Sequence, residues 1–183
     1  TKAYNILSDL YGISGIDVFL NKKIPIGSGL GGGSSNAAVT LLALNHIFKL
    51  NISKNNLVKI SEEIGADVPF FINGGAASVR GKGEIIEKIS ISNKYFVLVL
   101  PNINISSENI FESLSLKDFM NKSSLRELMK SNFNSFEKIV MTKYPVLKET
   151  KYWLSSFGSV RMSGTGSTLY IEYDNYQSAV DAN

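Results

Sequence analysis

Glycine and serine dominate one short stretch of this 183-residue sequence, residues 27–36, where only Leu30 and Asn36 are of other types. Glycines let backbone N–H groups converge on a ligand without obstruction by Cβ atoms. A helical pattern follows, and the first turn of a helix offers unpaired N–H groups and the positive end of its dipole. These residue types, in this order, predict a polyphosphate site, to which Ser34 and Ser35 can add hydroxyl donors or a ligand for Mg2+.

Two common phosphate-binding loops fit this stretch less well. Residues 27–32 match the dinucleotide pattern G-x-G-x-x-G, but that interpretation also requires a second strand that ends in an acidic residue about 20 positions later. Here residues 50–53 lead into another helical pattern. The P-loop pattern G-x-x-x-x-G-K-[ST] requires a lysine after the glycines, whereas Gly33 and Ser34 occupy that place. Both alternatives are disfavoured, as is a tight loop that binds nothing.

Asp67 is the candidate catalytic carboxylate. It follows the small residues Gly65 and Ala66 and has apolar neighbours, which can hold a carboxylate against a substrate hydroxyl. Phosphoryl transfer needs mainly positioning and charge stabilisation, so one acid near the attacking oxygen and a cradle of donors around the phosphates are sufficient. Asp67 can equally cap a helix that begins near Pro69, and the spacing leaves both roles open.

A second glycine-containing turn, residues 162–167 (M-S-G-T-G-S), combines two glycines and three hydroxyl side chains between two strand-like segments. Its backbone can approach an anion, or it can be an ordinary hairpin turn. His46 is interpreted as a surface residue near a helix end rather than as a base or metal ligand. The sequence contains no recognisable cluster of metal-ligating residue types, so no metal ligand is assigned.

Composition narrows the class of protein. Hydrophobic residues make up 44% and charged residues 19%, as in ordinary globular proteins. The net charge of +3 comes from scattered residues without a basic block, which argues against nucleic acid as a partner and only weakly favours an anionic ligand. The absence of cysteine excludes disulfides, thiolate zinc sites and thiol catalysis. No apolar run reaches the roughly 20 residues that a membrane span needs, so we expect a cytoplasmic protein that binds neither nucleic acid nor membranes.

In the first half of the chain, several predicted helices and strands position the candidate residues. Apolar spacing predicts a helix from Ala3 onward, and imperfect alternation over residues 16–24 predicts a strand that runs into the glycine-rich loop. Buried helical patterns follow at residues 37–50 and from the cap Ser53 to Gly65. Two short strands, residues 76–79 and 85–91, are expected to form a hairpin.

The second half predicts a sheet accompanied by helices. Residues 95–100 are interpreted as a short buried strand that stops at Pro101, and residues 159–163 and 167–173 as two further strands. Helical patterns cover residues 108–114, 124–129, 134–141, 145–157 and 176–182. This order indicates an α+β domain with a mainly antiparallel sheet. We therefore expect two domains, residues 1–91 and 92–183.

Three segments together resemble the GHMP kinase superfamily: P-I-G-S-G-L-G-G-G-S-S-N-A-A at residues 25–38, I-G-A-D-V-P-F at residues 64–70, and M-S-G-T-G-S at residues 162–167. Within it, the first two are most similar to the kinases of 4-diphosphocytidyl-2-C-methyl-D-erythritol. The resemblance covers nearly the whole chain. It implies an α+β fold of two domains, a ribosomal-protein-S5-like N-terminal domain that binds ATP and a ferredoxin-like C-terminal domain.

The resemblance also implies an activity: transfer of the ATP γ-phosphate, with Mg2+, to the 2-hydroxyl of that substrate in non-mevalonate isoprenoid biosynthesis. Asp67 would face the hydroxyl, Lys22 would lie near the adenine, the loop would surround the phosphates and the second turn would close on them. Residues 101–106 resemble a wall of the substrate pocket. The implied ATP-binding residues are Lys22, Pro25, Ile26, Gly27, Ser28, Gly29, Leu30, Gly31, Gly32, Gly33, Ser34, Ser35, Gly164, Thr165 and Gly166.

The sequence departs from the family pattern at its front. The family's first motif, with a lysine that works with the aspartate and residues that recognise cytidine, has no counterpart here. We expect it to precede Thr1, and the chain alone then lacks part of its site. Two other functions stay open: a GHMP kinase of another acceptor, such as mevalonate or homoserine, and a nucleotide-binding module without catalysis. A monomer or homodimer is expected, in the cytoplasm, or in the plastid if the source is a plastid-bearing eukaryote.

Overall fold

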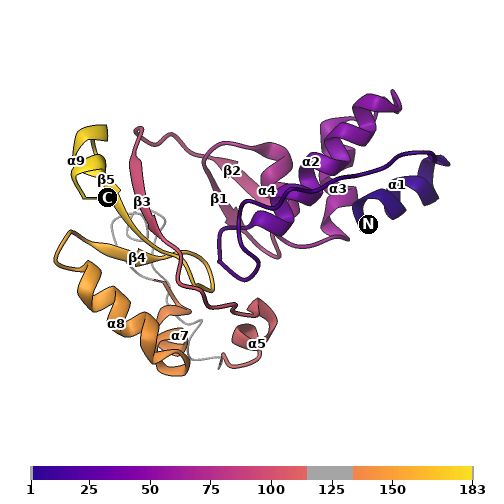
Figure 1. The fold of residues 1–183 in the computed structure, drawn as a ribbon. Helices are drawn as coiled ribbons and strands as arrows, with labels where there is room; N and C mark the ends of the chain where they lie inside the picture. Colours follow the sequence, from indigo (N-terminus) through magenta and orange to yellow (C-terminus); the bar gives the residue numbers. More distant parts are fainter. Residues whose placement is uncertain (1, 115–133, 183) are drawn as a thin grey trace. The chain divides into compact units, whose positions relative to one another are not determined.

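The computed structural model describes residues 2–114 and 134–182, which form two compact units (Figure 1). The first unit comprises Thr1–Lys23 and Gly31–Ile91, and the second comprises Ile24–Leu30 and Ser92–Asn183. The glycine-rich stretch is therefore divided, because its first part belongs to the second unit and its remainder to the first. Each unit has its own hydrophobic core.

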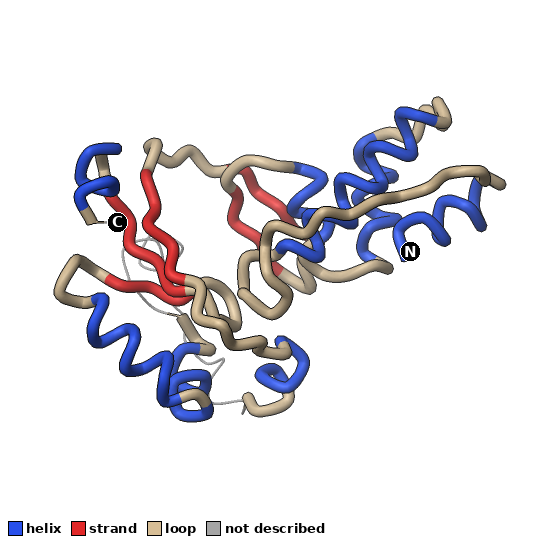
Figure 2. The backbone as a smooth tube through the Cα atoms, viewed as in Figure 1, coloured by secondary structure: helices blue, strands red, loops and turns tan. Residues whose placement is uncertain are grey.

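Four helices build most of the first unit: α1 (Lys2–Tyr11), α2 (Gly32–Ile47), α3 (Lys54–Glu62) and α4 (Val68–Asn73) (Figure 2). Helix α2 is central, because α1, α3 and α4 all contact it. The three-residue spacing of Ala38, Leu41 and Leu44 places these side chains on one face, where all three are buried. They pack with Leu7 of α1 and Leu57 of α3 in one cluster.

Local side-chain contacts fix how these helices begin and end. The Ser53 hydroxyl accepts a hydrogen bond from the Asn56 amide at 3.3 Å, which confirms the predicted cap of α3. Near the end of α2, the Asn45 side chain donates to the Ile52 carbonyl and accepts from the Ile52 amide, both at 3.0 Å. Asn45 thereby holds the connection between α2 and α3.

The predicted hairpin is confirmed in the first unit. Strands β1 (Ala77–Arg80) and β2 (Ile85–Lys88) pair antiparallel, with Arg80 opposite Ile85. By contrast, the strand predicted over residues 16–24 is wrong. This segment joins no sheet among the described residues, and the Phe19 side chain is 94% exposed. An alternating pattern forms a strand only where a partner satisfies its backbone groups, and no described strand pairs with this segment.

The second unit is built on a three-stranded antiparallel sheet in the order β3 (Tyr95–Val99), β5 (Leu169–Tyr173) and β4 (Val160–Met162). The helices among its described residues are α5 (Ser107–Phe111), α7 (Glu137–Lys143), α8 (Pro145–Leu154) and α9 (Tyr176–Asp181). One core joins the sheet to α5, α7 and α8. Its buried members are Ile105, Ile110, Val140, Leu147, Leu154, Val160, Met162, Leu169 and Ile171.

The predicted α+β class and antiparallel sheet are confirmed. Strand β3 differs from the expectation of a buried strand, because it lies at the sheet edge and the Phe96 side chain is 51% exposed. An apolar run cannot reveal edge position, since that depends on which strands become neighbours. The helix predicted over residues 124–129 lies outside the described residues. Within residues 2–114 and 134–182, no helix has the length and apolar character that crossing a membrane requires.

Candidate functional site

The first part of the glycine-rich stretch, residues 27–30, is held inside the second unit by backbone hydrogen bonds. The Gly27 carbonyl accepts from the amides of Ile105 and Ser167, both at 3.3 Å. The Ser28 carbonyl accepts from the Thr168 amide at 3.1 Å, and Ser28 is buried. These bonds fix the loop against residues 103–105 on one side and the β4–β5 turn on the other.

Two glycines in this part are required by neighbouring protein atoms. Both Gly27 and Gly29 have positive φ, 68° and 72°, in the region that disfavours side chains. A Cβ on Gly27 would lie 2.8 Å from the Ile105 amide nitrogen, and one on Gly29 would lie 2.6 Å from the Gly166 carbonyl oxygen. From the sequence, these glycines are expected to let the backbone approach a ligand. At these two positions, however, the atoms that the backbone approaches belong to the protein itself.

The β4–β5 turn is a hairpin turn that also packs on the loop. The Ser163 hydroxyl donates to the Gly29 carbonyl at 2.8 Å, and the Ser167 hydroxyl donates to the Ile103 carbonyl at 2.8 Å. The Thr165 and Ser107 hydroxyls share a third bond of 2.8 Å. These three hydroxyls therefore bond to protein, and Thr165 and Ser167 are buried. The hydroxyl of Thr168, which ends the turn, is buried without a hydrogen-bond partner among the described residues. Backbone N–H groups, rather than these side chains, are the donors such a turn can offer to a ligand.

The second part of the stretch begins α2. The helix predicted from Ala37 starts at Gly32, so residues 32–35 form its first turn rather than a loop. Gly31 occupies the N-cap position with φ 66°, and its carbonyl accepts the first helical bond from the Ser35 amide at 2.9 Å. The amides of residues 32–34 precede this bond and have no helical partner, and no acidic side chain lies in the first turn. This 16-residue helix therefore presents a positive end suited to an anion.

The glycines around this helix start have different neighbours. A Cβ on Gly31 would lie 2.6 Å from the ring of Phe71 in α4, so this glycine makes room for an aromatic side chain. A Cβ on Gly33 would meet no atom within 4 Å. Gly33 is exposed in the first turn, and protein packing gives no reason for a glycine there.

Asp67 lies at the N-cap position of α4, but its side chain makes no capping hydrogen bond. The carboxylate is exposed and makes no hydrogen bond or ion pair with the described residues. The Phe71 amide donates to the Asp67 carbonyl at 3.4 Å, so Asp67 stands one helical turn before the ring that lies against Gly31. The buried Val68 and Pro69 fix that turn in the core. Helix α4 thus connects the acid to the start of α2, both in the first unit.

The remaining predicted residues show fewer contacts. Lys22 is half-buried in the first unit, whereas Pro25 and Ile26 are exposed in the second. Ser34 and Ser35 are half-buried in the first turn of α2. In the described part of the chain, no three acidic or histidine side chains gather in a way that could hold a metal ion.

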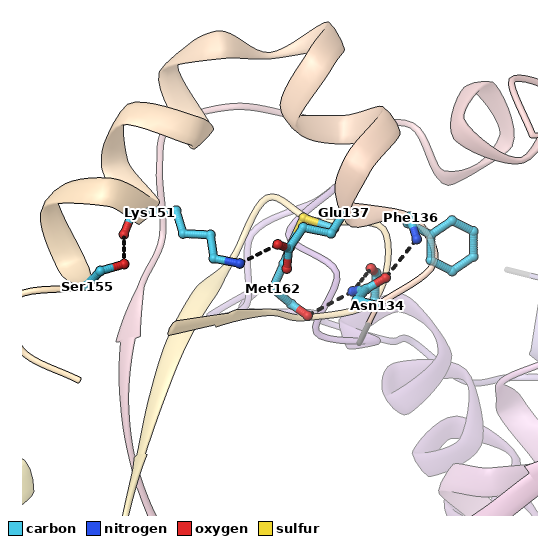
Figure 3. A network of polar contacts seen from close by, with 7 residues as sticks. Asn134, Phe136, Glu137, Lys151, Ser155 and Met162 are labelled. Carbon is cyan, nitrogen blue, oxygen red and sulfur yellow. Dashed lines mark hydrogen bonds and ion pairs between the residues drawn. The ribbon is translucent and has the colours of Figure 1, made fainter. Parts of the chain in front are cut away.

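Sequence reasoning missed two side chains that support the turn. Ser107 bonds to Thr165, as described above. Asn134 donates through Nδ2 to the carbonyls of Met162, at 2.9 Å, and Gly164, at 2.8 Å (Figure 3). The sequence interpretation made Asn134 the first residue of a helical pattern, and nothing in the sequence connects it with a turn about 30 residues later.

Comparisons with known proteins agree with this geometry. Residues 1–75 match the family model described as the GHMP kinases N terminal domain, and residues 114–182 match that of the GHMP kinases C terminal domain. The chain is 43% identical over 166 residues to a 4-diphosphocytidyl-2-C-methyl-D-erythritol kinase of Buchnera aphidicola subsp. Schizaphis graminum, covering 90% of this chain and 57% of the relative. It is 36% identical over 171 residues to a protein of the same name from Hahella chejuensis, covering 91% and 58%.

A solved structure is also similar. The crystal structure of a 4-(cytidine 5'-diphospho)-2C-methyl-D-erythritol kinase matches with a TM-score of 0.79 and 28% identity, covering 99% of this chain and 72% of that chain. The resemblance inferred from the three motifs, and the two-domain fold that it implied, are confirmed by these matches. The chain spans less than two thirds of the length of the curated relatives it matches.

Proposed function

Because the chain belongs to the GHMP kinase family, we propose that it acts in the ATP-dependent phosphorylation of the 2-hydroxyl of 4-diphosphocytidyl-2-C-methyl-D-erythritol. The observation that carries this proposal is the 43% identity over 90% of the chain to a kinase named for that substrate. The reaction would supply isoprenoid precursors by the non-mevalonate route. We expect it to take place in the cytoplasm.

The phosphates of ATP would be bound by the N-terminal end of α2 and the glycine-rich stretch before it. The free amides of the first turn of α2 and the absence of an acid there support this role. Gly164 and Thr165 would add backbone donors from the second turn, and Gly166 would close that turn through the hydrogen bond from its amide to the Ser163 carbonyl. Lys22 would lie toward the adenine, and Pro25 and Ile26 would begin the segment that surrounds the phosphates. In domain terms, residues 1–91 would form the ATP-binding domain and residues 92–183 the C-terminal domain.

Asp67 would act on the acceptor hydroxyl. Its carboxylate is exposed, carries no capping bond and is fixed at the start of a helix whose next residues are buried, so it is free to orient a hydroxyl. In phosphoryl transfer such an acid accepts the proton of the attacking oxygen while the donor cradle stabilises charge on the phosphoryl group. The chemistry therefore needs one acid and the phosphate cradle, which correspond to Asp67 and the start of α2.

Mg2+ would enter together with ATP. The candidate donors near the phosphates are the hydroxyls of Ser34 and Ser35, and the described residues contain no cluster of carboxylates that could hold a metal. This set of donors suits an ion held mainly by phosphate oxygens and water. When bound, Mg2+ would neutralise charge on the phosphates. The protein groups would orient those phosphates through the amides of the first turn of α2.

An acceptor panel tests the proposal. The chain is assayed with labelled ATP against 4-diphosphocytidyl-2-C-methyl-D-erythritol, mevalonate and homoserine, both alone and fused at its N-terminus to the front part of a relative that carries the family's first motif. Transfer to the cytidine compound supports the proposal, and transfer to another acceptor redirects it within the family. ATP binding without transfer in either form would indicate a binding module instead.

Asp67→Asn tests the assignment of the acid. In whichever form is active, we expect kcat to fall by about 10²–10⁴-fold, because the amide cannot accept the hydroxyl proton. The dissociation constant for ATP should not change, and the free energy of unfolding should stay within about 0.5 kcal/mol because the carboxylate has no partner to lose. Asp9→Asn, the same change at an exposed position of α1, is the control. Full activity of Asp67→Asn would remove this residue from the chemistry.

A further inference from the structure

We propose that Asn134 is a positioning residue that holds the β4–β5 turn, residues 163–168, in the conformation that binds phosphate; this rests on the proposed function of that turn. Asn134 precedes α7, and Figure 3 shows its side chain directed at the end of β4. No motif of the sequence pointed to it. Its contacts lie wholly within the second unit.

Every polar group of the Asn134 side chain is used. Nδ2 carries two hydrogens, and it donates one bond to the Met162 carbonyl at 2.9 Å and one to the Gly164 carbonyl at 2.8 Å. Oδ1 accepts from the Phe136 amide at 2.9 Å. Only an amide side chain of this length combines two donors on one atom with an acceptor beside it. The arrangement therefore depends on the residue type and not merely on its size.

The Met162 carbonyl belongs to the peptide group before Ser163, and the Gly164 carbonyl belongs to the peptide group after Gly164. Holding both restricts the backbone of the two residues between them, and one of these is Ser163, whose hydroxyl donates to the Gly29 carbonyl at 2.8 Å. The Ser163 carbonyl in turn accepts from the Gly166 amide at 2.9 Å. Asn134 thus lies at the start of a short series of contacts that reaches the first part of the glycine-rich stretch.

Asn134 is itself well anchored. The ring of Phe136 packs against that of Phe111 in α5, with centroids 5.0 Å apart. One residue later, Glu137 forms an ion pair with Lys151 of α8, which joins α7 to α8 beside the turn (Figure 3). Because these contacts fix the residues that follow Asn134, the Asn134 side chain can determine the conformation of the turn.

Asn134→Asp is the most direct test, because it preserves shape while it removes both donors and brings a carboxylate against two carbonyl oxygens. We expect the dissociation constant for ATP to rise by about tenfold. The amides of Gly166, Ser167 and Thr168 should exchange hydrogen faster, because the turn and the loop bonds behind them loosen. Asn134→Ser keeps one donor and one acceptor, so its ATP dissociation constant should lie between those of the unaltered chain and Asn134→Asp. This variant replaces Asn134→Asp in the test if the aspartate variant does not fold.

Asn45→Asp is the matched control. Asn45 also joins backbone groups through its amide, with bonds of 3.0 Å to both polar groups of Ile52, but it belongs to the first unit near the far end of α2. The Asn45→Asp variant should have a lower melting temperature but the same ATP dissociation constant. Binding is measured by titration calorimetry well below the melting temperature of the variant.

The outcomes separate this inference from the proposed function. If Asn134→Asp binds ATP as tightly as the unaltered chain, or if Asn45→Asp weakens binding equally, Asn134 is not a positioning residue. If neither the unaltered chain nor its N-terminal fusion binds ATP, the proposed function fails. In that case the exchange rates at residues 166–168 still decide whether Asn134 holds the turn, since unchanged rates in Asn134→Asp would overturn that part independently.

Discussion

At the scale of single residues, the glycines of the stretch serve two different purposes. Gly27 and Gly29 allow backbone to approach backbone, because a Cβ at either would overlap atoms of residues 104–105 or of the β4–β5 turn. Gly33 has no protein atom near the place where its Cβ would stand. Substitutions to alanine at Gly29 and Gly33 can therefore separate packing from ligand binding.

Gly29→Ala should destabilise the second unit. Alanine at φ 72° costs about 1–2 kcal/mol in backbone strain alone, and the carbonyl oxygen of Gly166 would have to move away from the new methyl group. We expect a loss of at least about 2 kcal/mol in the free energy of unfolding, measured by urea denaturation. A loss below about 0.5 kcal/mol would mean that the loop does not pack on the turn in solution.

Gly33→Ala should preserve stability but weaken ATP binding. Alanine in a helical turn is favoured over glycine by roughly 0.5–1 kcal/mol, so stability should hold or rise. If phosphate approaches the backbone at this position, the new methyl group should raise the ATP dissociation constant several-fold in titration calorimetry. Unchanged binding would show that the phosphates lie elsewhere along the stretch.

At the scale of elements, capping and packing decide where helices begin. Helix α3 starts where Ser53 satisfies the Asn56 amide, and α4 starts at a position whose side chain caps nothing. Helix α2 begins without any side-chain cap, at a glycine with positive φ. Two of these three starts therefore keep polar groups available, and they are the starts that carry the candidate phosphate site and the candidate acid.

Ser53→Ala should destabilise the first unit by about 1 kcal/mol, because the amide at the start of α3 loses its partner. The melting curve of the variant, followed by circular dichroism, measures this. Ser53→Asp keeps an acceptor at the cap and should retain most of the stability. Equal losses in both variants would show that the hydroxyl matters for packing and not for capping.

At the scale of the whole molecule, the glycine-rich stretch belongs to both units. Residues up to Leu30 pack in the second unit and residues from Gly31 in the first. Substitutions on the two sides of this boundary should therefore affect the stability of different units, although they lie only a few residues apart.

Much of the fold could be predicted from the sequence, because local signals were clear. The cap at Ser53, the hairpin connection at residues 80–83 and the pair of strands around residues 163–168 all follow from short-range preferences. The strand predicted over residues 16–24 failed because a strand needs a partner, and alternation says nothing about where that partner is. The exposure of β3 was missed because edge position depends on strand order.

The sequence by itself determined which groups are available for chemistry. These are a glycine-rich stretch before a helix, the acid Asp67 and a second glycine-containing turn, and together they indicate the kinase family. Those signals are local, since residue type and spacing fix the available donors and acids. Only the tertiary structure decided that Gly27 and Gly29 approach protein backbone, that three hydroxyls of the turn bond to protein, and that Asn134 binds two carbonyls at the turn. Such contacts join residues far apart in the chain, so they exist only once folding has brought them together.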